Sequence, residues 1–292
     1  MNVAFSACEA EVKLWDAGTC IATFAHERPR CVLNRCAYNR SGELLACGFS
    51  DGAVSFLNIK SGVPSTAPLF HLSQPGDNVT CLGFNHTGDT LYSGSDRGSV
   101  TVWNTAQRSI MRQHVLSSSP LVDISVACDD AHVAAGDSSG MLHILNATTH
   151  APPTAFRVCD NDLNAARFSP FQRRLLLACD DGGGVGAWDI TRGDRVASLT
   201  PHKSPATGLS FSPLNELLLV TCGLDKRILF HDLKSHKMVR MQMSQFFTVL
   251  HRMHQVKSLP TDLPLTSVAF GDNNTVIAGT SQGRLLVYCS NP

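Results

Sequence analysis

The sequence predicts an all-β fold assembled from repeated units of short strands. Residues 202–232, HKSPATGLSFSPLNELLLVTCGLDKRILFHD, contain three short apolar runs that are separated by Ser-Pro, Asn and Gly-Leu-Asp-Lys. Apolar runs of this length between turn residues are typical of strands rather than helices. Antiparallel hairpins of this size cannot bury both of their faces alone, so the unit requires copies of itself beside it.

One strand of this unit recurs along the whole chain. Its occurrences are VKLWD (12–16), VSFLN (54–58), VTVWN (100–104), LHILN (142–146), VGAWD (185–189), ILFHD (228–232) and LLVYC (285–289). Their fourth positions are spaced by 42, 46, 42, 43, 43 and 57 residues. A period of about 40–45 residues with a Trp-Asp ending is typical of the four-stranded blades of a β-propeller. We therefore predict a single domain over residues 1–292, an all-β, seven-bladed β-propeller.

The two ends of the chain predict an incomplete seam. The first repeat begins at its second strand, NVAFSAC, and the last repeat stops after its third strand, LLVYCSNP. The predicted propeller therefore lacks the inner strand of blade one and the outer strand of blade seven. Because a propeller normally closes by completing one blade from both termini, we expect the native chain to continue past Pro292.

The long spacing of 57 residues predicts an insertion at about residues 244–262, between blades six and seven. Apolar residues at helical intervals suggest a short amphipathic helix there, and a disordered loop or an error in the gene model are the alternatives. These apolar residues are Met243, Phe246, Phe247, Leu250 and Met253.

The repeat resembles the WD-repeat family over nearly the whole chain. Residues 202–232, together with LPLTSVAFGDNNTVIAGTSQGRLLVY (263–288), are similar to the propellers of the centrosomal WD-repeat adaptors that target γ-tubulin ring complexes. VKLWDAGTCIATFAH (12–26) is a weaker match to the same family.

The resemblance implies a non-enzymatic protein-interaction scaffold of the cytoplasm and cytoskeleton. In that family the propeller directs the protein to centrosomes and spindle poles, where its partners are centrosomal or spindle microtubule-associated proteins. In that family a helical C-terminal tail, for which residues 1–292 are expected to hold no counterpart, binds the γ-tubulin ring complex and promotes microtubule nucleation in mitosis. The alternative is a generic WD-repeat scaffold of another complex, such as a ubiquitin ligase adaptor or a chromatin module.

The resemblance also implies a hydrogen-bond network in each blade. It links a His before the inner strand, a Ser or Thr in the second strand, the Trp of the recurring strand and an Asp of the hairpin turn. Because the recurring strand keeps its Trp only at Trp15, Trp103 and Trp188, the network is expected to be incomplete in the other blades.

Composition disfavours several classes of protein. Lys plus Arg and Asp plus Glu are equal at 24 each, so net charge does not indicate a nucleic-acid or membrane partner. No apolar run approaches the ~20 residues of a membrane span, and the N-terminus does not resemble a signal peptide. Eleven cysteines without a C-x-x-C pair indicate reduced thiols in a cytosolic or nuclear-type compartment.

No motif predicts a catalytic residue, a cofactor or a metal. GDSSG (136–140) matches the G-x-S-x-G pattern of serine hydrolases, but it occupies a hairpin-turn position and a strand follows it. GGGVG (182–186) is likewise expected to be a hairpin turn rather than a phosphate loop. His251 and His254 have near-ligand spacing but no partner cysteine pair. Hydrolase activity at Ser138 is the remaining enzymatic alternative.

Charge is distributed unevenly along the chain. Residues 195–260 contain nine Lys or Arg and three Asp or Glu, a net charge of +6 against −6 for the remainder. In the predicted fold the loops between blades and the second hairpin turns share one face, which suits oriented docking of a charged protein partner. Ordinary solvated surface charge is the alternative. The predicted basic sector consists of Arg28, Arg30, Lys203, Lys226, Arg227 and Arg284. The predicted acidic sector consists of Asp137, Asp160, Asp162, Asp180 and Asp181.

Overall fold

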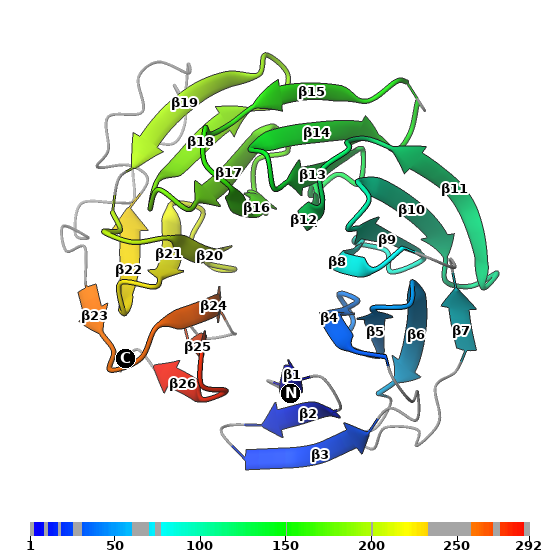
Figure 1. Ribbon diagram of the computed structural model, residues 1–292, viewed down its shortest axis with the longest axis horizontal. Helices are drawn as coiled ribbons and strands as arrows, with labels where there is room; N and C mark the ends of the chain where they lie inside the picture. The colour runs from blue at the N-terminus through cyan, green and yellow to red at the C-terminus, as the bar shows by residue number, and fades with distance from the viewer. Residues whose placement is uncertain are drawn as a thin grey trace. The chain divides into compact units, whose positions relative to one another are not determined.

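The described part of the chain is built from β-strands. The computed structural model describes residues 3–8, 11–16, 19–25, 31–59, 70–73, 77–149, 151–199, 201–232, 258–270 and 275–288. The regular elements in these ranges are the strands β1 to β26, with no helix among them (Figure 1). The part of the chain that the structure describes therefore contains no helix able to span a membrane. The all-β prediction is confirmed.

The chain divides into two compact units, residues 1–155 and 156–292. The boundary falls within β15, and each unit consists of antiparallel sheets whose strands follow one another along the chain. The first sheet consists of β1 (Val3–Cys8), β2 (Glu11–Asp16) and β3 (Thr19–Ala25), and the second of β4 (Leu33–Tyr38), β5 (Leu44–Phe49), β6 (Ala53–Asn58) and β7 (Phe70–Ser73). The third sheet consists of β8 (Val79–Phe84), β9 (Thr90–Ser95), β10 (Ser99–Asn104) and β11 (Ser109–Val115). The fourth consists of β12 (Leu121–Val126), β13 (His132–Asp137), β14 (Met141–Asn146) and β15 (Thr154–Arg157).

The second unit repeats the same arrangement. The fifth sheet consists of β16 (Leu163–Phe168), β17 (Leu175–Asp180), β18 (Val185–Asp189) and β19 (Asp194–Leu199). The sixth consists of β20 (Ala206–Phe211), β21 (Leu218–Gly223), β22 (Arg227–Asp232) and β23 (Ser258–Pro260), and the seventh of β24 (Leu265–Phe270), β25 (Val276–Thr280) and β26 (Leu285–Tyr288). Each sheet of four matches the predicted repeat, and the first and last sheets have three described strands. The closed ring of seven blades and its seam stay predictions.

Each inner strand has the same irregularity near its start. In β8 the register with β9 shifts between Val79 and Cys81, and in β20 the register with β21 shifts between Ala206 and Gly208. Such bulges bend and twist a strand. Because the bulge recurs at one place in successive sheets, it gives neighbouring inner strands the same shape.

The core lies between neighbouring sheets within each unit. In the first unit β8 packs against β4 and β12, and in the second unit β20 packs against β16 and β24. Trp103 and Phe56 are fully buried in one cluster that joins residues of the β4–β7 and β8–β11 sheets. Side chains of this size each contribute about 1.5–3 kcal/mol to folding on full burial. Cys47, Cys179 and Cys222 are buried, as predicted for small core residues of the second strands.

The predicted turns are confirmed. Gly98 closes the β9–β10 turn with a φ of 76°, and a Cβ there would lie 2.1 Å from the carbonyl oxygen of Ser117. Ser138 lies in the β13–β14 turn, where its amide donates to the carbonyl of Pro120, and β14 follows. GGGVG also forms a turn, in which the amide of Gly183 donates to the carbonyl of Asp180.

The predicted insertion needs a correction at its C-terminal end. Residues 258–260 lie inside the predicted range, yet they form β23, the outer strand of the sixth sheet, and pair with β22. The extra residues therefore precede the outer strand of this sheet rather than follow it. The predicted helix at residues 243–253 lies outside the described residues.

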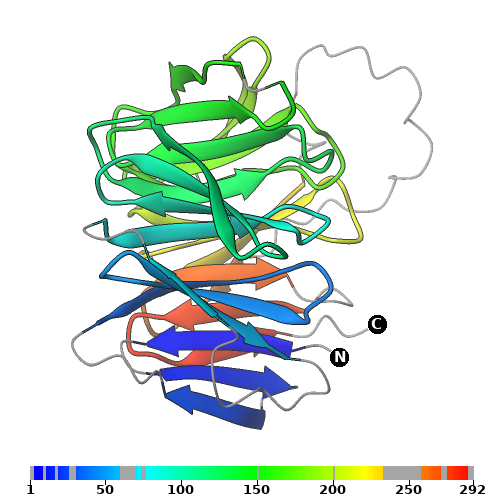
Figure 2. The same cartoon turned by 90° about the vertical axis from the view of Figure 1, so that its right-hand side faces the viewer.

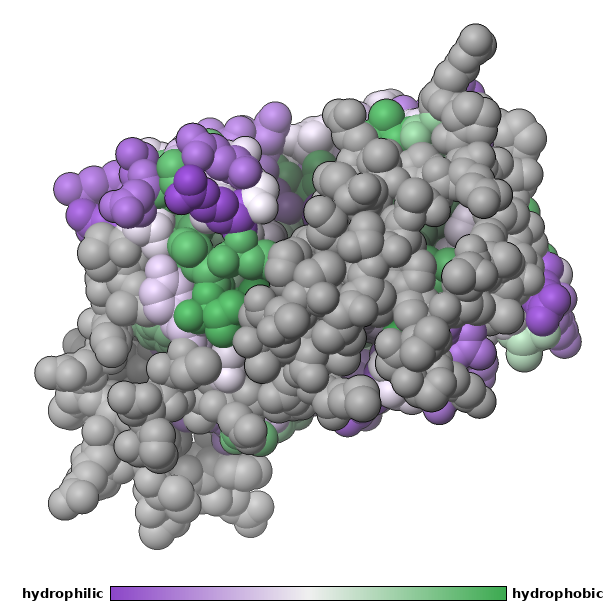
Figure 3. All heavy atoms as spheres, turned by 90° about the horizontal axis from the view of Figure 1, so that it is seen from below, coloured by the Kyte–Doolittle hydropathy of each residue, from purple (hydrophilic) through white to green (hydrophobic). Residues whose placement is uncertain are grey.

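The alternating strand directions place the turns of each unit at two opposite edges, as the edge-on view shows (Figure 2). The loops between sheets and the turns between second and third strands share one of these edges, which we call the hairpin edge. The described surface mixes hydrophilic and hydrophobic side chains, and Figure 3 shows a hydrophobic group bordered by hydrophilic residues. Among the residues that the structure describes, the exposed large hydrophobic ones are Val32, Ile110, Met111, Val115, Phe171, Leu214, Leu224 and Val287.

Candidate docking surface

Four of the six predicted basic residues lie on the hairpin edge of the second unit. Lys203 precedes β20, Lys226 and Arg227 belong to the β21–β22 turn, and Arg284 follows the β25–β26 turn. All four are exposed. Arg28 and Arg30 lie outside the described residues. We call Lys203, Lys226, Arg227 and Arg284 the basic edge.

A buried carboxylate holds the first part of the basic edge together. Asp225 accepts a hydrogen bond from His202 at 2.9 Å (Oδ1 to Nδ1) and another from the amide of Lys203 at 3.3 Å. The side chains of His202 and Asp225 are buried. The loop before β20 is therefore fixed against the β21–β22 turn, so that Lys203 is kept beside Lys226.

The hydrogen bonds of His202 continue into the core. Its Nε2 lies 2.8 Å from Oγ1 of Thr221, and the same oxygen lies 2.8 Å from Nε2 of His231. One assignment satisfies every group: His202 donates through Nδ1 to Asp225, Thr221 donates to Nε2 of His202, and His231 donates to Thr221. Thr221 and His231 are buried, so losing any member would leave a buried polar atom without a partner.

Backbone hydrogen bonds connect this turn to the last sheet. The amide of Thr261 donates to the carbonyl of Lys226 at 2.8 Å, and the amide of Ser281 donates to the carbonyl of Pro264 at 2.9 Å. The loop from 261 to 264 therefore contacts both the turn that carries Lys226 and the turn that precedes Arg284.

Three of the five residues of the predicted acidic sector are exposed, and the other two are partly or fully buried. Asp160, Asp162 and Asp181 are exposed on the hairpin edge of the second unit, and Asp181 accepts a hydrogen bond from Nδ2 of Asn164 at 2.8 Å. Asp180 is half-buried and accepts the amide of Gly184 at 3.0 Å.

Asp137 does not belong to that sector. It lies in the first unit and is only 1 % exposed, because it accepts hydrogen bonds from the amides of Ser139 and Met141 and from His143. Burial alone would raise the pKa of Asp137, but the hydrogen bonds from His143, Ser117, Ser139 and Met141 outweigh it and lower the pKa below its usual value. Asp137 therefore stabilises its own turn through hydrogen bonds.

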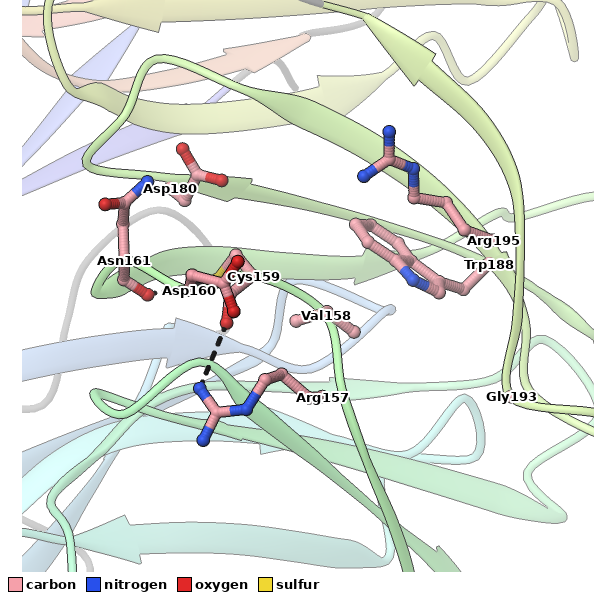
Figure 4. Close-up of a pocket in the computed structure, with 9 residues that line it drawn as sticks. All are labelled: Arg157, Val158, Cys159, Asp160, Asn161, Asp180, Trp188, Gly193 and Arg195. Atoms are coloured by element: carbon pink, nitrogen blue, oxygen red, sulfur yellow. Dashed lines mark hydrogen bonds between the residues drawn. The ribbon is translucent and has the colours of Figure 1, made fainter.

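A cavity of about 480 Å³ lies at β18 and β19 of the second unit. Figure 4 shows Trp188 and Arg195 at one end of it, Asp160, Asn161 and Asp180 at the other, and Val158 between them. Arg157, Cys159 and Gly193 complete its lining. Among the described residues, no group of three or more His, Cys, Asp or Glu side chains is placed to hold a metal ion.

Comparison with known proteins shows what the repeat belongs to. The family model described as "WD domain, G-beta repeat" matches residues 18–56, 67–104 and 193–232. The chain is 29 % identical to the protein NEDD1 of Homo sapiens over 98 % of its own length, with the same values for NEDD1 of Bos taurus and Mus musculus. The three stretches that match the family model, which together make up less than half of the chain, are similar to WD repeats. The resemblance to the centrosomal adaptors, which the sixth and seventh repeats indicate, is confirmed by these matches to NEDD1.

Other relatives share the fold more distantly. The chain is 24 % identical over 74 % of its length to the target of rapamycin complex subunit LST8 of Mus musculus, covering 67 % of that protein. A chain in a crystal structure of the mitotic checkpoint complex superposes with a TM-score of 0.82 and 18 % identity, covering all of this chain and 87 % of the other. The chain spans 41 % of the length of the NEDD1 proteins that it matches.

Among the described sheets, the sixth has a connected WD-repeat network although its recurring strand contains no Trp. The expectation that it requires the Trp of the recurring strand is wrong for the sixth sheet, because His231 occupies the position opposite Leu219 that Trp103 occupies opposite Leu91. An imidazole Nε2–H replaces the indole N–H as the donor to the hydroxyl. Thr221 and the two flanking His residues were the available signal in the sequence.

Trp103 and Trp188 occupy equivalent positions in their sheets but differ in the hydrogen bonding of the indole N–H. Trp103 donates from Nε1 to Oγ of Ser93 at 2.7 Å. The residue equivalent to Ser93 in the fifth sheet is Ala178, which has no hydroxyl. Trp188 accordingly has no such hydrogen bond within the described part of the chain, and its indole lines the cavity instead.

Proposed function

We propose that this chain is a non-enzymatic scaffold, the targeting module of an adaptor that recruits γ-tubulin ring complexes to centrosomes and the spindle in mitosis. The observation that carries the proposal is the similarity to NEDD1 along 98 % of the chain. The proposal includes the closure of the sheets into one seven-bladed ring. It also includes a cytoplasmic and cytoskeletal location, with the centrosome and spindle pole as the sites of accumulation.

The basic edge is the proposed docking surface for the protein partner. Its four cations are exposed, whereas Asp225, the acidic residue of the same turn, is buried and bound to His202. The exposed charge of this turn is therefore positive, which favours an acidic surface on a centrosomal or spindle microtubule-associated protein. Nucleic acid, membrane lipid and cofactors are not part of the proposed activity.

Imaging of the full-length protein with a fluorescent tag tests the proposal. Accumulation at spindle poles during mitosis is the expected result. A diffuse distribution throughout mitosis would overturn it. Purification of cullin-adaptor or histone-modifying subunits with the tagged protein, without γ-tubulin, would instead support a scaffold of another complex.

A further inference from the structure

Two small residues, Gly186 and Ala178, lie where the cavity's indole, that of Trp188, packs against its own sheet. Gly186 takes the position that Thr101 has beside Trp103, and a Cβ at residue 186 would lie 2.1 Å from Cη2 of Trp188. The indole therefore lies directly over the backbone of Gly186. Ala178 removes the hydroxyl that would bind the indole N–H, so both changes favour an indole that lines the cavity.

The two ends of the cavity differ in charge, and Arg157, whose Nη1 donates to the carbonyl of Cys159 at 3.3 Å, lies near Asp160 (Figure 4). Arg195 lies beside Trp188, whereas Asp160 and Asp180 lie at the far end (Figure 4). The pKa of Cys159 is raised to about 11, chiefly by burial and then by the negative charge of Asp180, while Arg157 has the opposite effect. Within the described residues, neither Arg195 nor Asp160 has a hydrogen bond or ion pair from its side chain.

The charges of the lining residues limit what the cavity can bind. A purely anionic ligand would meet Asp160 and Asp180, and a purely cationic one would meet Arg195 and Arg157. A ligand with both charges, oriented along the cavity, would satisfy both ends. The volume of about 480 Å³ lies in the range of ligand pockets, roughly 300–1,000 Å³, and suits a few side chains of a peptide.

We propose that this cavity binds a short extended peptide segment that carries one basic and one acidic side chain. The acidic side chain pairs with Arg195 beside the indole of Trp188, and the basic side chain pairs with Asp160. The residues that line this cavity are not those of the basic edge, so the cavity is a second proposed contact of the scaffold. It would recognise the spacing of two side chains in a peptide rather than the net charge of a surface.

Fluorescence titration of the full 292-residue protein tests this site. Four acetylated and amidated peptides serve as probes: Ser-Arg-Val-Glu-Ser, the forms with Gln in place of Arg or of Glu, and the form with both replaced. We expect the doubly charged peptide to change the emission of Trp188 and to bind about 3–10-fold more tightly than either singly charged one. The same titration of Trp188→Phe identifies the signal of this indole.

Two substitutions assign the charges. Arg195→Gln should reduce binding of the doubly charged peptide to the level of the Arg-only peptide, and Asp160→Asn should reduce it to the level of the Glu-only peptide. Arg192→Gln is the matched control, because Arg192 is exposed three residues away but does not line the cavity. Equal affinities for all four peptides, no emission change that depends on Trp188, or an equal loss with Arg192→Gln would each overturn the proposal.

Discussion

Single hydroxyl groups decide how the interior of each sheet is connected. Thr221 in the sixth sheet and Ser93 in the third occupy equivalent positions, and each binds the ring nitrogen of the recurring strand's fourth residue. Ala135 and Ala178 take this position in the fourth and fifth sheets, where no hydroxyl is available. A side chain of two or three heavy atoms therefore separates sheets with an internal hydrogen-bond network from sheets held by apolar contacts.

Thr221→Val should destabilise the protein by about 2–3 kcal/mol, because the change leaves two buried imidazole nitrogens without a partner. Urea unfolding followed by circular dichroism measures the difference. Ser198→Ala, which removes an exposed hydroxyl from an outer strand, is the control and should stay within about 0.5 kcal/mol of the parent. Equal stability of Thr221→Val and Ser198→Ala would show that the network contributes nothing.

Gly186→Ala should displace the indole of Trp188, because the new methyl group would overlap the ring. Overpacking of this kind typically costs about 1–3 kcal/mol. The expected result is a shift of the emission maximum together with a lower free energy of unfolding. Unchanged emission and stability would mean that the indole does not lie over residue 186 in solution.

Asp137→Asn should destabilise the protein by about 1.5–3 kcal/mol at neutral pH, since the carboxylate braces its turn through several hydrogen bonds. The pKa of Asp137 is lowered in the folded state, so its contribution is complete above the unfolded pKa of about 3.9 and is lost as pH falls through the folded pKa. Unfolding measured at several pH values should show the two proteins converging below pH ~4. Asp162→Asn, at an exposed site, should show no such pH-dependent gap.

At the scale of elements, β11 differs from the other described outer strands. Ile110 is 47 % exposed, Met111 52 % and Val115 79 %, and β11 forms the free edge of its sheet. An exposed apolar edge strand is a template for pairing with another chain. Met111→Lys should reduce light scattering on mild heating and change the free energy of unfolding by no more than about 0.5 kcal/mol. Gln113→Lys adds the same charge without removing an apolar side chain, so an equal reduction there would assign the effect to charge alone.

Elements with strong local patterns could be predicted from the sequence, and those defined by distant partners could not. VTVWN predicted a strand at 100–104, and the structure has Ser99–Asn104, because apolar residues and a Gly turn act locally. β23 was missed, since three residues ending in Pro260 form a strand only through pairing with β22.

The residues of the candidate docking surface and of the cavity could likewise be predicted only where their position depends on local sequence. The turn positions of Lys203, Lys226 and Arg227 follow from the repeat, so their exposure could be predicted. The burial of Asp137 could not be, because it depends on His143 from the next strand turning back onto it. The position of the Trp188 indole depends on Ala178 and Gly186, which come next to it only once the strands are in register.

At the scale of the whole molecule, the neutral chain carries an uneven charge along the hairpin edge of its second unit. The cations of the basic edge lie on the last two sheets, where Asp262 is also exposed, and the exposed Asp160, Asp162 and Asp181 lie on the β16–β19 sheet. Charges arranged in this way orient an approaching partner and raise its association rate, an effect that salt screens over about 10 Å at 0.1 M. The arrangement therefore predicts docking that is fast and sensitive to ionic strength.

Reversal of the basic edge tests this prediction. In the full-length protein, Lys203→Glu, Lys226→Glu and Arg227→Glu together should lower co-sedimentation with isolated centrosomes at low salt by about tenfold, and should flatten its dependence on salt. The control reverses Arg173, Arg174 and Arg192, which are exposed in turns at the opposite edge of the same unit. Both variants change net charge equally, so a loss confined to the first assigns docking to the basic edge. Equal losses would reduce the effect to overall charge, and no loss in either would place the contact on another surface.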